Sequence, residues 1–414
     1  MISVRSLYNI LLHFTWIVLH LIAIFNTKIS LFVKGRKRTR AILSAKHLTN
    51  EKVIWMHVAS LGEYEQGLPI LEKLRVHYSS YKIVLTFFSP SGYEIKKDSP
   101  IADAVVYLPL DTKFNAKRFL EMVNPEVAIF VKYEIWPNYL HELKQRNIPT
   151  FLISAIFSKK QIFFKWYGGF MRKTLGAFSH FFVQDKTSEA LLKSIGYDNV
   201  TISGDTRFDR VSKIMGQDNH LDFMEKFKNN HFCMVAGSSW PEDEKLLVEY
   251  INSTDAPTKF VIAPHNIKQG HIDGLKNIIH KKSICFSEIE DKSLADFEVL
   301  IVDTIGLLTK IYSYANVAYV GGAFATGLHN TLEPATFGIP IVIGPKYEGF
   351  KEAEDLVDNK GILVITNPSE FKSLMDRFIT DVDFMRKTGT INASYVNENR
   401  GATNLILDHI KTFL

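Results

Sequence analysis

The sequence predicts an α/β protein with two doubly wound domains, and three observations lead to this prediction. Its 414 residues exceed the roughly 100–200 residues of one ordinary domain. After residue 50, short runs of β-branched and aromatic residues alternate with amphipathic stretches. This alternation pauses at the polar stretch GDTRFDRVSKIMGQDNH and then restarts. A 46% apolar content with 22% charged residues excludes a disordered chain.

Strands are expected in two series, one on each side of that polar stretch. The first series lies at residues 53–58, 82–88, 104–108, 127–131, 150–154, 180–184 and 200–203. The second lies at 231–237, 259–264, 299–303, 317–322, 340–344 and 362–365. Ligands of open parallel sheets bind beyond the carboxyl ends of the strands, so we expect a substrate cleft between two facing domains. The expected divisions are an N-terminal segment at 1–35, a first domain at 36–215 and a second domain at 216–414.

The positive charge of the chain is concentrated at its start. Residues 1–50 hold eight Lys or Arg and no Asp or Glu, which leaves 41 basic against 44 acidic residues in the rest. A nucleic-acid binder spreads its basic residues over a binding face, so this distribution argues against one. Cys233 and Cys285 form no CxxC pair and have no His at metal-ligand spacing, which predicts a reducing compartment and no structural metal.

Residues 7–25, LYNILLHFTWIVLHLIAIF, form an uncharged stretch that the basic cluster KGRKRTR follows. A cleaved signal peptide carries its basic residues ahead of the apolar stretch, so a membrane anchor is the better interpretation. The anchor either spans the bilayer or lies in the headgroup plane, and polar residues such as Asn9 and His13 keep the second alternative open. In both cases the cluster at 34–40 should face anionic phospholipids on the cytoplasmic side.

A second stretch, at residues 158–178, interleaves large apolar residues with five Lys or Arg. The apolar residues that matter most are Phe163, Phe164, Trp166, Tyr167, Phe170 and Met171. This pattern suits a membrane interface or an amphiphile that bears acyl chains and phosphates. An ordinary amphipathic helix explains it equally well, and stacking on single-stranded nucleic acid is disfavoured by the charge of the main body.

Two carboxylates follow strands of the first half. Glu63, in the turn SLGEYEQG, can deprotonate an acceptor hydroxyl as a general base, although complementing the helix macrodipole explains its position more simply. Glu134, in VKYEIWPNYL, can hold a substrate hydroxyl or orient Glu63, and a solvated acid at a helix start fits as well.

The run GGAFATGLHNTLEPATFGIPIVIGP at 321–345 is the most informative part of the second half. Its loop amides can bind phosphate, Asn330 can bind phosphate or sugar, and Glu333 can bind a ribose diol. A glycine-rich turn before a helix explains the glycines but not the string LHNTLEPA. APHN at 263–266 and DTIGLL at 303–308 also follow strands and should line the same wall. No GxGxxG motif is present, which disfavours a dinucleotide dehydrogenase.

Together these motifs resemble the Kdo transferases, which move 3-deoxy-D-manno-octulosonic acid (Kdo) from CMP-Kdo to a lipid A precursor. SLGE, KYEIWPN, SGDTRFD, VAGSSWPEDE, APHN, DTIGLL and LHNTLEPA occur in that family's order and spacing over nearly the whole chain. The resemblance implies a GT-B type glycosyltransferase of lipopolysaccharide core biosynthesis at the cytoplasmic face of the inner membrane. It also implies an acceptor (lipid IVA) domain followed by a CMP-Kdo domain, with no metal or other cofactor.

The resemblance assigns roles to individual residues. Glu63 is implied as the catalytic base, and Glu134 and Arg207 as groups that stabilise the transition state. Donor binding is implied for Pro264, His265, Asn266, Gly306, Leu307, Leu308, Gly322, Asn330, Thr331, Leu332 and Glu333. The implied reaction is an inverting transfer, in which the acceptor hydroxyl attacks the anomeric carbon of Kdo as CMP leaves.

Five residues depart from the family pattern. Arg207 replaces a Lys, Leu307 replaces a Glu and Thr331 replaces a Pro, while His265 and Asn266 stand where the family has an Arg-His pair. A neutral His binds anions more weakly than Arg, so phosphate recognition at His265 stays an open question. Two other functions remain open: a GT-B enzyme that uses a UDP-sugar and another lipid acceptor, and a non-catalytic membrane-bound scaffold.

Overall fold

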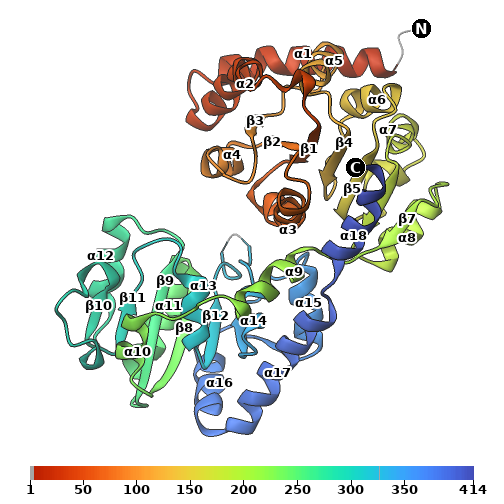
Figure 1. Ribbon diagram of the computed structural model, residues 1–414. Coiled ribbons are helices and arrows are strands. Elements are labelled where there is room, and N and C mark those ends of the chain that lie inside the picture. The colour runs from red at the N-terminus through yellow and green to blue at the C-terminus, as the bar shows by residue number, and fades with distance from the viewer. Residues whose placement is uncertain (1–3, 326) are drawn as a thin grey trace. The chain divides into compact units, whose positions relative to one another are not determined.

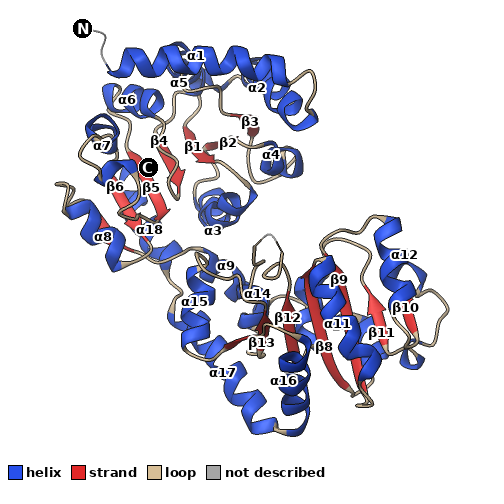
Figure 2. Ribbon diagram, turned by 180° about the vertical axis from the view of Figure 1, so that it is seen from behind, coloured by secondary structure: helices blue, strands red, loops and turns tan. Residues whose placement is uncertain are grey.

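The computed structural model describes residues 4–325 and 327–414, and the chain divides into two compact units. The first comprises Met1–Arg210 and Arg400–Leu414, and the second comprises Val211–Asn399. Each unit contains one seven-stranded sheet in which every pairing is parallel, enclosed by helices (Figures 1 and 2). The predicted α/β architecture with two parallel sheets is therefore confirmed.

The sheet of the first unit has the strand order β3-β2-β1-β4-β5-β6-β7. Its central strand β1 (VIWMHV) is buried along its full length, as expected for a parallel sheet with both faces covered. In the register, His57 of β1 lies opposite Thr86 of β2 and Phe130 of β4, so the carboxyl ends of these strands lie together. The strands are β1 Val53–Val58, β2 Lys82–Phe87, β3 Ala104–Tyr107, β4 Val127–Val131, β5 Thr150–Ala155, β6 His180–Val183 and β7 Val200–Ile202.

Ten helices belong wholly or mainly to the first unit as far as the structure describes it. They are α1 Val4–Ile22, α2 Thr27–Ala45, α3 Leu61–His77, α4 Pro90–Lys96, α5 Lys113–Val123, α6 Pro137–Gln145, α7 Gly169–Leu175, α8 Lys186–Lys193, α9 Arg207–Ser212 and α18 Ala402–Ile410. Two apolar clusters fill the two faces of the sheet, and the second includes Ile406 and Ile410 of α18.

The sheet of the second unit has the order β10-β11-β9-β8-β12-β13-β14. Its strands are β8 Phe232–Ser239, β9 Thr258–Pro264, β10 Ser283–Cys285, β11 Val299–Ile301, β12 Val317–Val320, β13 Ile341–Ile343 and β14 Ile362–Val364. Its helices are α10 Asp222–Lys228, α11 Pro241–Ser253, α12 Gln269–Ile278, α13 Leu308–Ile311, α14 Leu332–Thr336, α15 Lys351–Asp358, α16 Pro368–Thr380 and α17 Val382–Glu398. Sequence analysis missed β10, because a three-residue edge strand carries too little pattern.

The structure divides the chain differently from the predicted boundaries at its C-terminal end. Residues 400–414 pack on the first unit, where the Phe413 and His409 rings lie 5.2 and 5.8 Å from the ring of Phe151 in β5. Figure 1 shows α18, at the blue end of the colour scale, beside β5. The order of residues along the chain does not reveal that the C-terminal segment packs on the first unit.

The N-terminal segment forms a helical hairpin on the first unit. α1 ends at Ile22, and Asn26 then caps α2 by accepting a hydrogen bond from the Ile29 amide at 3.1 Å, so the apolar stretch 7–25 does not stay in one helix. No helix within the described residues has both the length and the apolar character needed to cross a bilayer. The structure therefore gives no support to the spanning alternative of the predicted anchor.

Candidate active site

Glu63 lies in the first turn of α3, directly after β1. Its Oε2 accepts hydrogen bonds from the backbone amides of Ala59 and Ser60, the latter at 2.9 Å. Glu63 therefore does stabilise the N-terminus of α3. The side chain is only 6% exposed, and burial, together with the neighbouring charge of Glu134, raises its pKa to about 7. A carboxylate with a pKa near neutrality is well matched to accept a proton as a general base, so both roles are compatible.

Glu134 is held in place by a buried histidine and a half-buried tryptophan. Its Oε2 accepts a hydrogen bond from Nε1 of Trp136 at 2.9 Å and lies 3.2 Å from Nε2 of His57, a fully buried residue. The turn before it needs a left-handed backbone at Lys132, whose φ is +66°. Glu134 thus reaches the carboxyl end of the sheet beside Glu63 as a fixed group.

The hydrogen bonds of Thr86 define the protonation of His57. Thr86 Oγ1 accepts a hydrogen bond from Trp55 at 2.9 Å and donates one to the Met56 carbonyl at 3.3 Å. Its hydrogen is therefore used, and His57 Nδ1, at 2.9 Å, must be the donor to Thr86. Trp136 Nε1 donates to His57 Nε2 at 3.0 Å as well as to Glu134 Oε2 at 2.9 Å, so one indole N–H bridges these two groups.

Arg207 is tied to the same region through Asp205. Its Nε and Nη2 lie 2.9 and 2.8 Å from Asp205 Oδ2, which also accepts a hydrogen bond from Gln66 in α3 at 2.9 Å. Gln66 lies one turn after Glu63, so the segment GDTRFD is fixed against the helix that begins with the candidate base. Arg207 remains about 31% exposed and presents a cation at this end of the first unit.

In the second unit, His265 belongs to a stack of three rings. The indole of Trp240 lies 4.8 Å from the His265 ring at 14°, and His265 lies 4.7 Å from the His329 ring. Trp240 Nε1 donates a hydrogen bond to His329 Nε2 at 2.9 Å, so His329 carries its proton on Nδ1. Burial, together with the neighbouring His265, lowers the pKa of His329, which keeps this ring neutral at physiological pH.

The loop after β12 is shaped by Gly322 and Asp243. Gly322 has φ +98°, and a Cβ there would stand 2.2 Å from the Gly327 carbonyl, so a larger residue would displace the loop. Asp243, fully buried, accepts hydrogen bonds from the Gly322 amide at 2.8 Å and the Tyr319 hydroxyl at 2.7 Å.

Glu333 joins this loop to the segment DTIGLL. Its Oε1 accepts a hydrogen bond from Asn330 at 3.0 Å, and its Oε2 accepts one from Thr309 at 2.6 Å. Leu307 and Leu308 lie at the start of α13, two residues and one residue before Thr309, and Gly306 has φ +96°. The structure therefore brings together the candidate donor residues of 303–309 and 330–333.

The remaining candidate residues have mainly structural contacts. Pro264 ends β9 opposite Ser239, and Asn266 accepts a hydrogen bond from the Lys268 amide at 3.1 Å. Thr331 and Leu332 are buried at the start of α14, and Thr331 Oγ1 is buried without a hydrogen-bond partner. No three His, Cys, Asp or Glu residues gather as a metal site in the described parts of the chain, and the expectation of a metal-free reaction stays a prediction.

Comparison with known proteins bears on these motifs. The family described as "3-Deoxy-D-manno-octulosonic-acid transferase (kdotransferase)" matches residues 35–210. The 3-deoxy-D-manno-octulosonic acid transferase of Haemophilus influenzae is 26% identical over 382 residues, which cover 87% of each chain. That of Aquifex aeolicus is 26% identical over 358 residues, 84% of this chain and 92% of the relative. The chain is thus similar to Kdo transferases over most of its length, and the family model itself matches residues 35–210. This chain is therefore a glycosyltransferase.

Solved structures show the same fold at low sequence identity. A UDP-GlcNAc 2-epimerase from Neisseria meningitidis bound to UDP-GlcNAc is 13% identical with a TM-score of 0.61, over 87% of this chain and all of that chain. MurG from Acinetobacter baumannii is 12% identical with a TM-score of 0.54, over 87% and 99%. These similarities support a two-domain, GT-B-like fold.

Sequence analysis did not select four residues that the structure places in these sites. His57 and Trp136 orient Glu134, while Trp240 and His329 complete the ring stack. The positions of His57 in a β-strand and Trp240 just before a helix give no signal of their own. Only the pairing of distant segments brings each to its partner.

Proposed function

We propose that this glycosyltransferase transfers Kdo from CMP-Kdo to a lipid A precursor, lipid IVA, in lipopolysaccharide core biosynthesis. The observation that carries the proposal is the buried pair Glu63 and Glu134 at the carboxyl ends of β1 and β4, with the pKa of Glu63 raised to about 7. The names of the relatives supply the transferred sugar.

Glu63 acts first in the proposed reaction. Its carboxylate takes the proton of the acceptor hydroxyl as the hydroxyl oxygen forms a bond to the anomeric carbon of Kdo. The bond from that carbon to the phosphate oxygen breaks, and CMP leaves with the electron pair. Positive charge that develops on the sugar ring is stabilised by the carboxylates, as in glycoside hydrolysis.

The leaving phosphate is stabilised by fixed donors. Arg207 supplies a cation from the first unit. The proton on His329 Nδ1 is a neutral donor, because Trp240 already occupies Nε2. The His329 ring beside His265 thus takes part of the role that the family gives to an Arg at the position of His265.

We further propose that α1 holds the enzyme on the cytoplasmic face of the inner membrane, in the headgroup plane. α1 packs Leu12, Trp16 and Leu19 against the first unit, and its outer face exposes apolar side chains three or four positions apart. The exposed residues are Val4, Leu7, Ile10, Leu11, Phe14, Ile17 and Leu21. Trp166 and Tyr167, 92% and 61% exposed, add a second aromatic contact from the stretch 158–178.

The test is mass analysis of the lipid product after incubation of the full chain with CMP-Kdo and lipid IVA. We expect a product heavier by one or more Kdo residues. Protection against thermal unfolding by CMP but not by UDP would separate this donor from the UDP-sugar alternative. An unchanged acceptor at saturating CMP-Kdo would support the scaffold alternative and overturn the proposal.

A further inference from the structure

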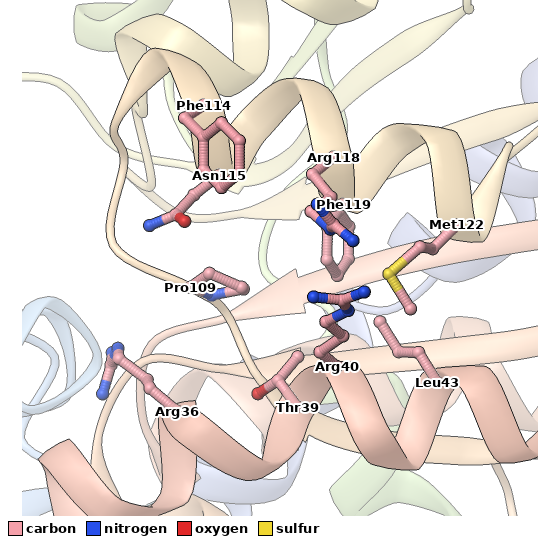
Figure 3. A pocket seen from close by; sticks show the side chains of 10 residues that line it. All are labelled: Arg36, Thr39, Arg40, Leu43, Pro109, Phe114, Asn115, Arg118, Phe119 and Met122. Carbon is pink, nitrogen blue, oxygen red and sulfur yellow. The ribbon is translucent and has the colours of Figure 1, made fainter.

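A hollow lined by both cationic and apolar side chains lies between α2 and α5 of the first unit. We name it the α2–α5 pocket, and its volume is about 180 Å³. Figure 3 shows Arg40 of α2 and Arg118 of α5 pointing toward one another across it, with Leu43 and Met122 at one end. The full lining is Arg36, Thr39, Arg40, Leu43, Pro109, Phe114, Asn115, Arg118, Phe119 and Met122.

Arg36, at the other end of the α2–α5 pocket, is a buried cation. It is 6% exposed and stacks on the ring of Phe32, with 3.4 Å between the guanidinium carbon and the ring centroid. Its two terminal nitrogens donate to the carbonyls of Phe32 and Phe88 at 3.2 and 2.8 Å, but its Nε is buried without a hydrogen-bond partner. Burial lowers the pKa of Arg36 to about 9, so it is still charged at neutral pH.

No carboxylate compensates these cations. Within residues 4–325 and 327–414, no ion pair joins Arg36, Arg40 or Arg118 to an acidic side chain. A buried charge without a counter-charge is unfavourable, and an arginine fork is well suited to a phosphate. An anion in the α2–α5 pocket would supply a counter-charge to buried Arg36 and to the more exposed Arg40 and Arg118.

A neighbouring hollow of about 320 Å³ extends this pocket toward α1. The two share four lining residues, among them Arg36 and Phe114, and the second adds His13 and Trp16 of α1 and Lys37 of α2. The pocket is thus connected to the helix whose outer face is apolar and exposed. A ligand that enters from the side of α1 meets both apolar surface and positive charge.

We propose that the α2–α5 pocket binds one anionic phospholipid from the membrane surface. The phosphate lies among Arg36, Arg40 and Arg118, and a segment of acyl chain contacts Leu43 and Met122. A free inorganic anion would leave this apolar end unoccupied, so the lining favours a lipid as the source of the phosphate.

This lipid is a bound partner and not the sugar acceptor. The rings of Phe88 and Trp136 lie 4.8 Å apart; the backbone carbonyl of Phe88 accepts from Arg36, and the indole N–H of Trp136 donates to Glu134. These two rings separate the phosphate position from the carboxylate. The inference rests on the proposed function only in naming a membrane as the supply of lipid, and its test does not measure transfer.

The experiment measures binding of water-soluble dioctanoyl phosphatidic acid to the full chain by native mass spectrometry and calorimetry. The test variant is Arg40→Gln with Arg118→Gln, because both side chains lie at the mouth of the pocket and are not needed for the core. The matched control is Arg38→Gln with Lys117→Gln, which removes the same charge from the same helices outside the pocket. We expect about tenfold weaker binding in the test variant and less than about twofold change in the control.

Two further probes distinguish the source of the phosphate. Dioctanoylglycerol, which lacks phosphate, and inorganic phosphate alone should each bind about tenfold more weakly than the phospholipid. Equal loss of binding in both double variants would show general surface attraction and overturn the proposal. Binding of inorganic phosphate as tight as that of the phospholipid would also overturn it, in favour of a simple anion site. The variant Arg36→Met should lose phospholipid binding while keeping the packing of the side-chain stem.

Discussion

Replacing Glu63 by Gln should separate its catalytic role from its effect on stability. Gln keeps an oxygen that can accept from the amides of Ala59 and Ser60, but it cannot take a proton from the acceptor hydroxyl. We expect kcat to fall by about two orders of magnitude or more, with CMP affinity unchanged. Wild-type kcat/KM should also fall as the pH drops below about 7, the pKa of Glu63, because the base becomes protonated.

Ionisation of Glu63 has opposite effects on catalysis and on stability: it supplies the base but destabilises the folded state. The pKa of Glu63 is raised from 4.5 to about 7 in the folded protein, so the folded state binds this proton more tightly than the unfolded state. The wild-type protein therefore loses stability as the pH rises through this interval, and the Gln variant does not. Relative to Gln, the ionising side chain lowers the free energy of unfolding by about 1 kcal/mol at pH 5 and about 3 kcal/mol at pH 8.

The assay is amide hydrogen exchange of β1 and β4, which reports opening of the first unit by itself. The difference in opening free energy between variant and wild type should grow by roughly 2 kcal/mol from pH 5 to pH 8. Any difference in capping strength between Gln and the protonated carboxyl shifts both values equally and leaves this growth unchanged. The exposed Glu121→Gln is the control and should show no growth. A pH-independent difference for Glu63→Gln would refute the assignment of a raised pKa.

Three further outcomes are expected. His57→Gln should lower kcat by about tenfold with little change in the KM for CMP-Kdo, because Trp136, which donates to both His57 and Glu134, loses one partner and holds Glu134 less firmly; a matching loss of CMP binding would contradict a positioning role. Trp240→Phe keeps the stacked ring but removes the indole N–H, so calorimetry should show CMP binding weakened by about fivefold, and unchanged affinity would exclude this hydrogen bond from donor binding. Phe14→Ser with Ile17→Ser should reduce sedimentation with anionic vesicles by about tenfold or more while the melting temperature stays unchanged, and undiminished sedimentation would argue against attachment through α1.

The strands were predictable because a parallel sheet covered on both faces needs continuous apolar runs. VIWMHV and VAIFV match β1 and β4 to the residue, and all thirteen expected strands lie within two residues of the observed bounds at each end. One of the largest differences is the run 317–322, in which the two glycines belong to the loop after β12. Glycines that follow a strand look like its continuation until the left-handed φ of Gly322 is known.

The candidate site was only partly predictable. Glu63 and Glu134 follow strands, so the sequence placed both at the carboxyl edge of one sheet. The raised pKa of Glu63 depends instead on burial and on a neighbour 71 residues away, and the partnership of His57 with Glu134 joins residues 77 apart. The stretch 158–178 was hardest to interpret, since it divides into buried Phe163, a short helix and exposed Trp166, a division that depends on tertiary packing.

The N-terminal helix has a consequence for where catalysis takes place. α1 is fixed by Arg5 and Asn9, which bind Asn138 at the start of α6 at 3.0 and 3.2 Å, and by Tyr8, which donates to Asp111 after β3 at 2.8 Å. Both docking points lie at the carboxyl edge of the first sheet, the edge that carries Glu63 and Glu134. If the outer face of α1 lies in the headgroup plane as proposed, this edge is held close to the bilayer, and the acceptor hydroxyl needs to rise only a short way from the lipid surface to reach Glu63. Interfacial attachment then contributes to catalysis directly, because it fixes the height of the base above the lipid that it deprotonates.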